Sequence, residues 1–115
     1  MVEELEKIEI AIPEPGIRMK AKVVGIKRGK LKELINIDAI RNDAIRERMK
    51  KNAERDAIQI EFEVGGAVYN RTMLYSLNPR SNFYKLMKKL GGKLQIGSEI
   101  EVIFDDRGRP RIVVE

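Results

Sequence analysis

Apolar and polar residues alternate along several stretches of the chain, which is the spacing of a half-buried β-strand. The pattern predicts five strands, at residues 17–27, in a hairpin over 57–75, and at 99–104 and 110–114. In the first strand the alternation shifts phase after Val23 and Val24, next to Gly25. A glycine at a phase shift predicts a β-bulge, which lets one long strand bend into both halves of a small barrel.

The turn of the hairpin has two possible registers. A two-residue turn, Gly65–Gly66, pairs Ile60 with Arg71 and places this arginine on the core face. A three-residue turn that includes Ala67 reverses every side chain of the second strand. Because burying an unpaired arginine costs more free energy than burying a bonded asparagine, we favour the three-residue turn. Val68, Asn70, Thr72 and Leu74 then face inward, while Tyr69, Arg71, Met73 and Tyr75 face outward.

Two other stretches repeat apolar residues every three or four positions, the period of an amphipathic helix. Residues 36–55 carry a narrow apolar stripe, with Asn36 or Asp38 as the N-cap, and are predicted to be an insertion lying on the barrel. Residues 81–90 are predicted to form a short helix that Ser81 caps and Gly91–Gly92 end.

Residues 1–16 precede this pattern and differ from it in charge. They contain five acids and one base, a net charge of −4, whereas the whole chain has a net charge of +5. Residues 8–12 alternate briefly and could add an edge strand before the prolines interrupt the chain. We therefore expect an acidic segment over 1–16 and one domain over 17–115. The acidic start does not resemble a signal peptide, and no apolar run suits a membrane helix, so a cytoplasmic protein is expected.

The sequence contains neither Cys nor His, which excludes disulfides, thiolate chemistry and the commonest metal ligand. No paired pattern of carboxylates, hydroxyls or lysines indicates a catalytic centre. Asp105–Asp106, beside Gly108, is typical of a turn. We therefore expect no enzyme activity, no cofactor and no metal. The 36% of charged residues is typical of heat-adapted proteins, although six asparagines weigh against this interpretation.

Positive charge is concentrated in three blocks without acidic residues, at 17–32, 78–95 and 107–111. Blocks of one sign are typical of a surface that binds a polyanion. The alternative is a solvated surface, and for the lysines of the 81–90 helix this alternative is preferred.

Without the insertion, the element order is strand–strand–strand–helix–strand–strand. This order, the long first strand with Gly25, and the segment Ile96–Val102 leading into the fourth strand resemble the OB barrel. Over residues 17–115 the chain is similar to small OB-fold single-stranded nucleic-acid-binding proteins of hyperthermophilic archaea and their mobile elements, and to phage-type single-strand binders.

The resemblance implies a mainly β fold with α-helices: a five-stranded OB-like barrel, a helix inserted between strands 1 and 2, and a short helix between strands 3 and 4. OB barrels bind oligonucleotides on the face of strands 2 and 3, between the loops that join strands 1–2 and 4–5. Mapped onto this chain, the nucleic-acid-binding residues are Lys27, Arg28, Lys30, Lys32, Tyr69, Arg71, Tyr75, Arg107, Arg109 and Arg111. We therefore expect non-catalytic binding of single-stranded DNA or RNA.

Other roles remain open for several of these features. The chain could be a protein-interaction module whose inserted helix docks Ile37, Ile40, Ala44 and Met49 on a protein partner or forms a homo-oligomer. Tyr69 and Tyr75 could be ordinary packing residues beneath that helix. The acidic N-terminal segment is expected to fold over the basic groove and compete with a ligand.

Overall fold

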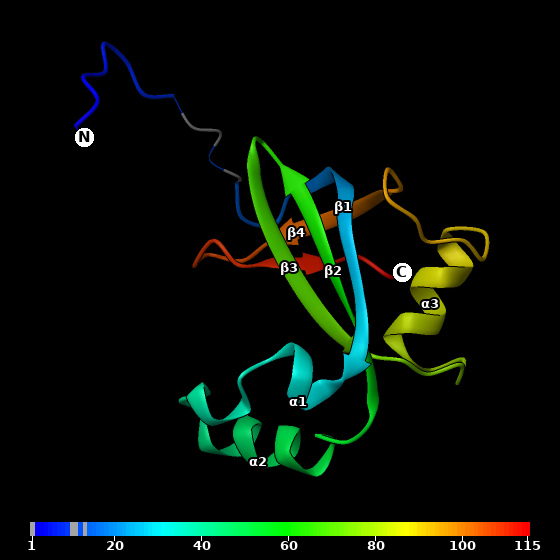
Figure 1. Ribbon diagram of the computed structural model, residues 1–115. Coiled ribbons are helices and arrows are strands. Elements are labelled where there is room, and N and C mark those ends of the chain that lie inside the picture. Colours follow the sequence, from blue (N-terminus) through cyan, green and yellow to red (C-terminus); the bar gives the residue numbers. More distant parts are fainter. Residues whose placement is uncertain (1, 10–11, 13) are drawn as a thin grey trace.

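The computed structural model of the chain describes residues 2–9, 12 and 14–115 and contains a five-stranded OB-like barrel (Figure 1). The strands are β1 (Arg18–Lys30), β2 (Asp56–Val64), β3 (Ala67–Leu74), β4 (Glu99–Phe104) and β5 (Pro110–Ile112). They form one antiparallel sheet in the order β3-β2-β1-β4-β5. β3 and β5 lie close together, but within the described part of the chain no hydrogen-bonded ladder joins them. The predicted fold class is confirmed.

β1 serves both halves of the barrel. Its start pairs with β4 and its later part with β2, while Lys22 has a register partner in each. The register with β2 shifts between Val23 and Gly25, which confirms the predicted bulge. Val24 is the bulged residue and is 39% exposed. A Cβ atom at Gly25 would lie 3.1 Å from Cδ of Glu61, so the bulge brings the backbone close to a side chain of β2.

The β2–β3 hairpin has the two-residue turn, so the three-residue turn that we favoured is wrong. Val64 pairs with Ala67 and Ile60 with Arg71. The turn glycines, Gly65 and Gly66, have φ angles of 59° and 82°, as a tight turn with two left-handed residues requires. Arg71 takes the core phase yet stays exposed, because β3 there faces the unpaired gap toward β5. The burial penalty that favoured the other turn therefore does not arise.

The predicted helical insertion between β1 and β2 is confirmed, but it consists of short segments rather than one helix over 36–55. The segments are α1 (Leu31–Leu34), the 3-10 turn η1 (Ile37–Ala39) and α2 (Asp43–Lys51). Ile40 is extended, with φ −72° and ψ 121°, and this conformation interrupts the helix. α2 takes its cap from Asn42, whose Oδ1 accepts a hydrogen bond from the Ile45 N–H at 3.0 Å. α1 packs against β1 and β2, whereas α2 packs mainly on η1.

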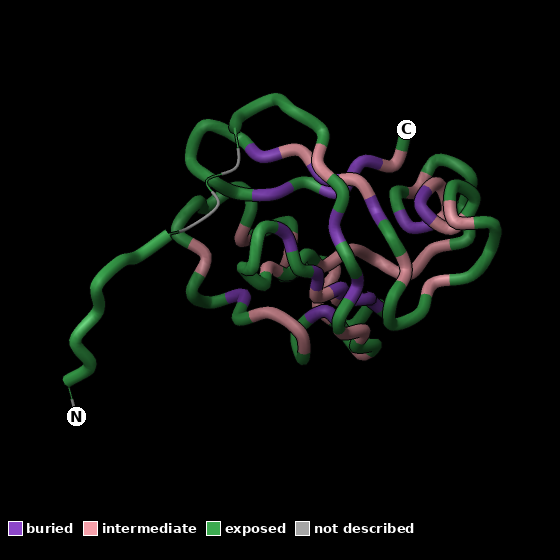
Figure 2. Tube along the Cα trace, turned by 90° about the horizontal axis from the view of Figure 1, so that it is seen from above, coloured by how far each residue is buried: buried purple, intermediate pink, exposed green. Residues whose placement is uncertain are grey.

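The buried core draws on β1, β2, β4 and β5 and is completed by α3 (Asn82–Lys89), while β3 packs half-buried side chains against it. All three phenylalanines are buried in it, as predicted. The predicted helix over 81–90 is confirmed: Ser81 Oγ accepts a hydrogen bond from the Tyr84 N–H at 3.2 Å, and the Gly92 N–H donates to the Met87 carbonyl at 2.7 Å. Figure 2 shows the buried residues concentrated along the strands and in α3.

The N-terminal segment leaves the barrel beside the end of β4. Pro15 forms an isolated bridge with Phe104, and the Gly16 N–H donates to the Phe104 carbonyl at 3.0 Å. Before this anchor, residues 2–9 extend away from the barrel and are exposed (Figure 2). The edge strand predicted over 8–12 includes residues 10 and 11, which lie outside the described residues, and Ile8, Glu9 and Ile12 have no strand pairing. No helix among the described residues is long and apolar enough to cross a membrane.

Candidate nucleic-acid interface

The first group of predicted cations lies on regular structure rather than in a loop. Lys27, Arg28 and Lys30 are on β1, and Lys32 is in α1. The loop prediction is wrong because β1 continues to pair with β2 as far as Lys30 and Asp56. The alternating pattern that predicts a strand over 17–27 does not continue through residues 28–30, so the sequence did not indicate this extension.

Each cation of this group faces a carboxylate. Lys27 Nζ lies 3.4 Å from Glu61, Arg28 Nη2 lies 3.2 Å from Asp56, Lys30 Nζ lies 2.9 Å from Glu54, and Lys32 pairs with the same Glu54. The hydrogen bonds from Lys32 and Lys30 hold the pKa of Glu54 at about 2, below its ordinary value of 4.5. The bond with Glu54 also raises the pKa of Lys30. Both shifts favour the charged forms of Lys30 and Glu54. The four cations share three carboxylates, so most of their positive charge is neutralised within the group.

The two predicted stacking tyrosines face the core, so the prediction that they face outward is wrong. The Tyr69 ring centre lies 5.2 Å from that of Phe104. The Tyr75 ring centre lies 4.7 Å from that of Phe83 in α3, and the Arg28 guanidinium covers the Tyr75 ring at 4.0 Å. They pack against the barrel core and α3, not beneath the insertion.

The outer face of the β2–β3 hairpin therefore carries polar and acidic side chains. Its cross-strand pairs are Gln59 with Thr72, Glu61 with Asn70, and Glu63 with Val68. Glu61 is paired with Lys27, whereas Glu63 has no ion pair with a described residue and would repel a phosphate backbone. This face has no aromatic ring in the part of β2 and β3 that the structure describes. The face that OB barrels commonly use is poorly suited to nucleic acid in this chain.

Three other predicted residues do converge. Arg71 of β3, Arg109 of the β4–β5 turn and Arg111 of β5 line one hollow of about 460 Å³. We call this hollow the seam site, because it lies in the unpaired gap between β3 and β5. Its other lining residues are Ile103, Phe104, Asp105 and Pro110.

Asp105, the single carboxylate among the described residues that line the seam site, is engaged in the turn. Its Oδ1 accepts hydrogen bonds from the N–H groups of Arg107 at 2.9 Å and Arg109 at 2.8 Å, and its Oδ2 accepts one from Arg109 Nε at 3.2 Å. These bonds, led by the backbone N–H of Arg109, lower the pKa of Asp105. The predicted turn role is confirmed. Arg71, Arg107 and Arg111 have no ion pair with any described residue.

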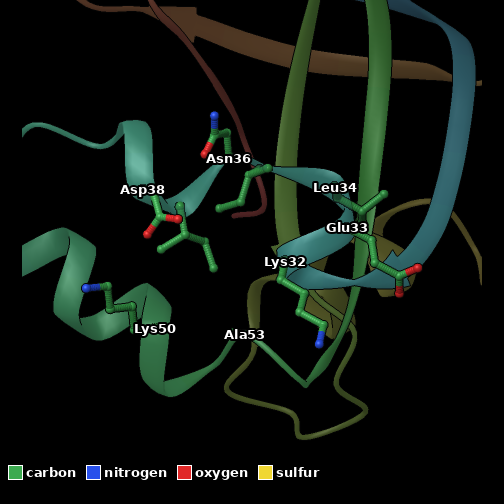
Figure 3. A pocket seen from close by; sticks show the side chains of 9 residues that line it. Lys32, Glu33, Leu34, Asn36, Asp38, Lys50 and Ala53 are labelled. Atoms are coloured by element: carbon green, nitrogen blue, oxygen red, sulfur yellow. The ribbon is translucent and has the colours of Figure 1, made fainter.

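A larger hollow of about 550 Å³ lies within the β1–β2 insertion (Figure 3). Its two carboxylates, Glu33 and Asp38, point in different directions (Figure 3). Glu33 Oε1 accepts a hydrogen bond from the Lys30 N–H at 2.9 Å, so it serves the start of α1. Lys32 and Lys50 give the hollow mixed charge. The described residues contain no group of three potential metal ligands, and this hollow offers no carboxylate pair for catalysis.

The apolar stripe predicted to dock on a partner is turned mostly inward. Ile37 is buried, Ile40 and Met49 are half-buried, and Ala44 is exposed. The insertion therefore uses these side chains largely to pack its own short segments together.

Two cations that the sequence did not assign, Arg55 and Arg80, line a further hollow of about 490 Å³ beside β3. We call it the β3-edge hollow. Arg80 belongs to the acid-free block at 78–95, so composition marked its stretch of chain. Nothing marked Arg55, because Glu54 and Asp56 flank it.

The best candidate interface is therefore the seam site, with Arg107 exposed on the adjoining turn. Known proteins do not indicate its ligand, because no protein-family model, curated protein or solved structure matches the chain.

Proposed function

We propose that the protein binds single-stranded nucleic acid, without catalysis, through the seam site. The observation that carries this proposal is the convergence of Arg71 and Arg111 from two strands on one hollow, each without an ion pair among the described residues. The planar guanidinium group donates paired hydrogen bonds to phosphate oxygens. Phosphate contacts supply most of the affinity of binders that do not read sequence.

The lining of the seam site favours a single strand over a duplex. Cationic side chains lie beside half-buried Ile103, and buried Phe104 and Pro110 lie behind them, so the lining is both charged and apolar. A single strand exposes its bases along with its phosphates, and it can contact both kinds of surface. A duplex keeps its base faces stacked inside and offers mainly phosphates.

The first cation group adds little to this surface in the free protein. Lys27, Arg28, Lys30 and Lys32 are held by carboxylates, and a phosphate would have to displace these partners. Exposed ion pairs are worth little individually, yet each one reduces the local positive potential. The proposed interface is consequently one-sided, along the gap between β3 and β5.

The test is fluorescence anisotropy of a labelled oligothymidylate, an oligouridylate and a duplex over a series of salt concentrations. We expect single strands to bind more tightly than the duplex, with affinity falling steeply as salt rises. The R71Q/R111Q variant should lower the slope of log K against log salt by about 1.4, since each single-strand phosphate contact contributes roughly 0.7. The matched control is R48Q/K51Q on exposed α2, which removes the same charge and should leave the slope unchanged.

Two outcomes would contradict the proposal. The first is affinity for single strands no greater than for duplex or heparin. The second is an equal loss in both double variants, which would show diffuse attraction to a basic protein. Replacing residues 40–51 with a Gly–Ser linker tests the alternative function, because this change spares α1 and Arg55. A lost oligomer or partner with unchanged oligonucleotide affinity would favour a protein-interaction module.

A further inference from the structure

Among the described residues, the β3-edge hollow is lined by two arginines and by no carboxylate. Arg55 comes from the link between α2 and β2, and Arg80 from the link between β3 and α3. Neither forms an ion pair with a described residue. Arg55 Nη1 donates to Asn52 Oδ1 at 3.1 Å, and the guanidinium of Arg80 makes no hydrogen bond within the described part of the chain. Both groups can therefore bind an anion without first breaking an ion pair.

The segment that carries Arg80 is held in place by its own hydrogen bonds. Ser81 Oγ lies 2.8 Å from the carbonyl oxygens of both Ser76 and Asn78. Asn78 Oδ1 accepts the Arg80 N–H at 2.9 Å. The backbone around Arg80 is consequently pre-organised, which lowers the entropy lost when a ligand binds.

A third, smaller hollow borders both the β3-edge hollow and the seam site. This hollow, of about 150 Å³, shares Arg111 with the seam site and Asn82 with the β3-edge hollow. Arg18 also lines this third hollow, and its Nη1 lies 3.8 Å from Oε2 of Glu101. Among the described residues that line the third hollow, Glu115 is the one acidic residue. Its main-chain oxygen accepts a hydrogen bond from Lys89 Nζ at 3.2 Å.

We propose that the β3-edge hollow is a second phosphate-binding site, which holds the same single strand as the seam site. This inference rests on the proposed function. Two arginine clusters that border the same third hollow suit a ligand with repeated phosphates better than one small anion. The nucleic-acid strand then passes from Arg71 at the seam site to Arg55 and Arg80 beside β3. It avoids the outer β2–β3 face, where Glu63, which has no ion pair with a described residue, would repel it.

The decisive experiment is a length series of oligothymidylates bound to wild type, R55Q/R80Q and R71Q/R111Q. The shortest oligonucleotides, which occupy one site, should bind R55Q/R80Q as tightly as wild type. Longer ones should lose about tenfold in affinity, because two charge-assisted contacts are missing. R71Q/R111Q should lose affinity at every length, and the R48Q/K51Q control at none. If R55Q/R80Q binds long oligonucleotides like wild type, the second site is refuted and the seam site stands.

A second measurement does not depend on oligonucleotide binding. Inorganic tripolyphosphate should shift the NMR signals of the Arg55 and Arg80 Nε–H groups, and R55Q/R80Q should leave the Arg71 shift intact. Unshifted Arg55 and Arg80 signals would overturn the inference. Shifts without any oligonucleotide binding would refute the shared strand and the proposed function together. Polyglutamate competing as strongly as oligothymidylate would refute the nucleic-acid assignment in favour of an acidic-peptide site.

Discussion

The guanidinium carbon of Arg28 lies 4.0 Å from the centre of the Tyr75 ring, and its Nη2 lies 3.2 Å from Asp56. A cation over an aromatic face is attracted by the ring quadrupole. The ring of Phe83 also packs against the Tyr75 ring, and the two ring centres are 4.7 Å apart. Two residues predicted to contact nucleic acid, Arg28 and Tyr75, thus support the junction of β1, β3 and α3.

Tyr75→Ala should act on stability more than on binding. We expect a loss of about 2–4 kcal/mol in the free energy of unfolding, typical of removing a packed aromatic ring. Tyr75→Phe keeps the ring and should cost less than about 1 kcal/mol. Urea unfolding measures both changes. Full stability of Tyr75→Ala with lost oligonucleotide affinity would instead identify Tyr75 as a stacking residue.

Arg71→Leu should separate stability from binding. Arg71 takes the core phase of β3, in line with Tyr69 and Met73, so an apolar side chain there extends the core into the gap toward β5. We expect unfolding to become harder by about 0.5–1 kcal/mol and single-strand affinity to fall. The control is Asn70→Leu on the outer face, which should give no such gain. Stability lost in R71L would mean that the arginine supports the fold.

Glu54→Gln should release Lys30 and Lys32 from their shared ion-pair partner. The pKa of Glu54 is lowered to about 2, so its contribution to stability is complete above its ordinary value of 4.5 and disappears as pH falls through about 2. The stability difference between wild type and E54Q should therefore shrink over this range in urea unfolding. At neutral pH, E54Q frees Lys30 and Lys32 and should strengthen polyanion binding at low salt. Glu63→Gln removes the same charge without breaking an ion pair, and a similar gain from it would refute this explanation.

Deleting residues 1–14 should tighten binding of single strands at low salt. Residues 2–9 extend away from the barrel and do not cover the basic groove as we expected. Pro15, however, is anchored to Phe104, which also lines the seam site, so the acidic segment is tethered at the edge of the arginine cluster. A short tether gives its carboxylates a high effective concentration there. We expect a several-fold gain in affinity that vanishes at high salt. Replacing the glutamates at 3, 4, 6 and 9 with glutamine should reproduce the gain, and unchanged affinity in both variants would exclude competition.

The strands and α3 were predictable because their signals are local. Alternation located β1, β2 and β4, and the phase shift located the bulge at Val24. The Ser81 cap and Gly91–Gly92 marked both ends of α3. The extent of the inserted helix was not predictable, because its narrow apolar stripe fits equally well with short segments that the extended Ile40 separates.

The site depended on information that lies outside any local window. The correct register of β3 places Arg71 on the core face, and the sequence predicts that burying this arginine is unfavourable. Only the gap between β3 and β5 keeps the side chain exposed and removes that burial penalty. Likewise, Glu54 at the end of the insertion pairs with both Lys30 and Lys32 at its start. The two predicted basic loops do not converge. The arginines at 71, 109 and 111 form one cluster, whereas the cations at 27–32 are engaged in ion pairs.

The double pairing of β1 has a consequence for how the chain folds. The β2–β3 and β4–β5 hairpins close over short turns, whereas β1 must find β4 near the other end of the sequence, with Arg18 opposite Ile103. Closing so long a loop is entropically unfavourable and slows folding. The two hairpins should therefore form early, and the docking of β1 between them should set the folding rate.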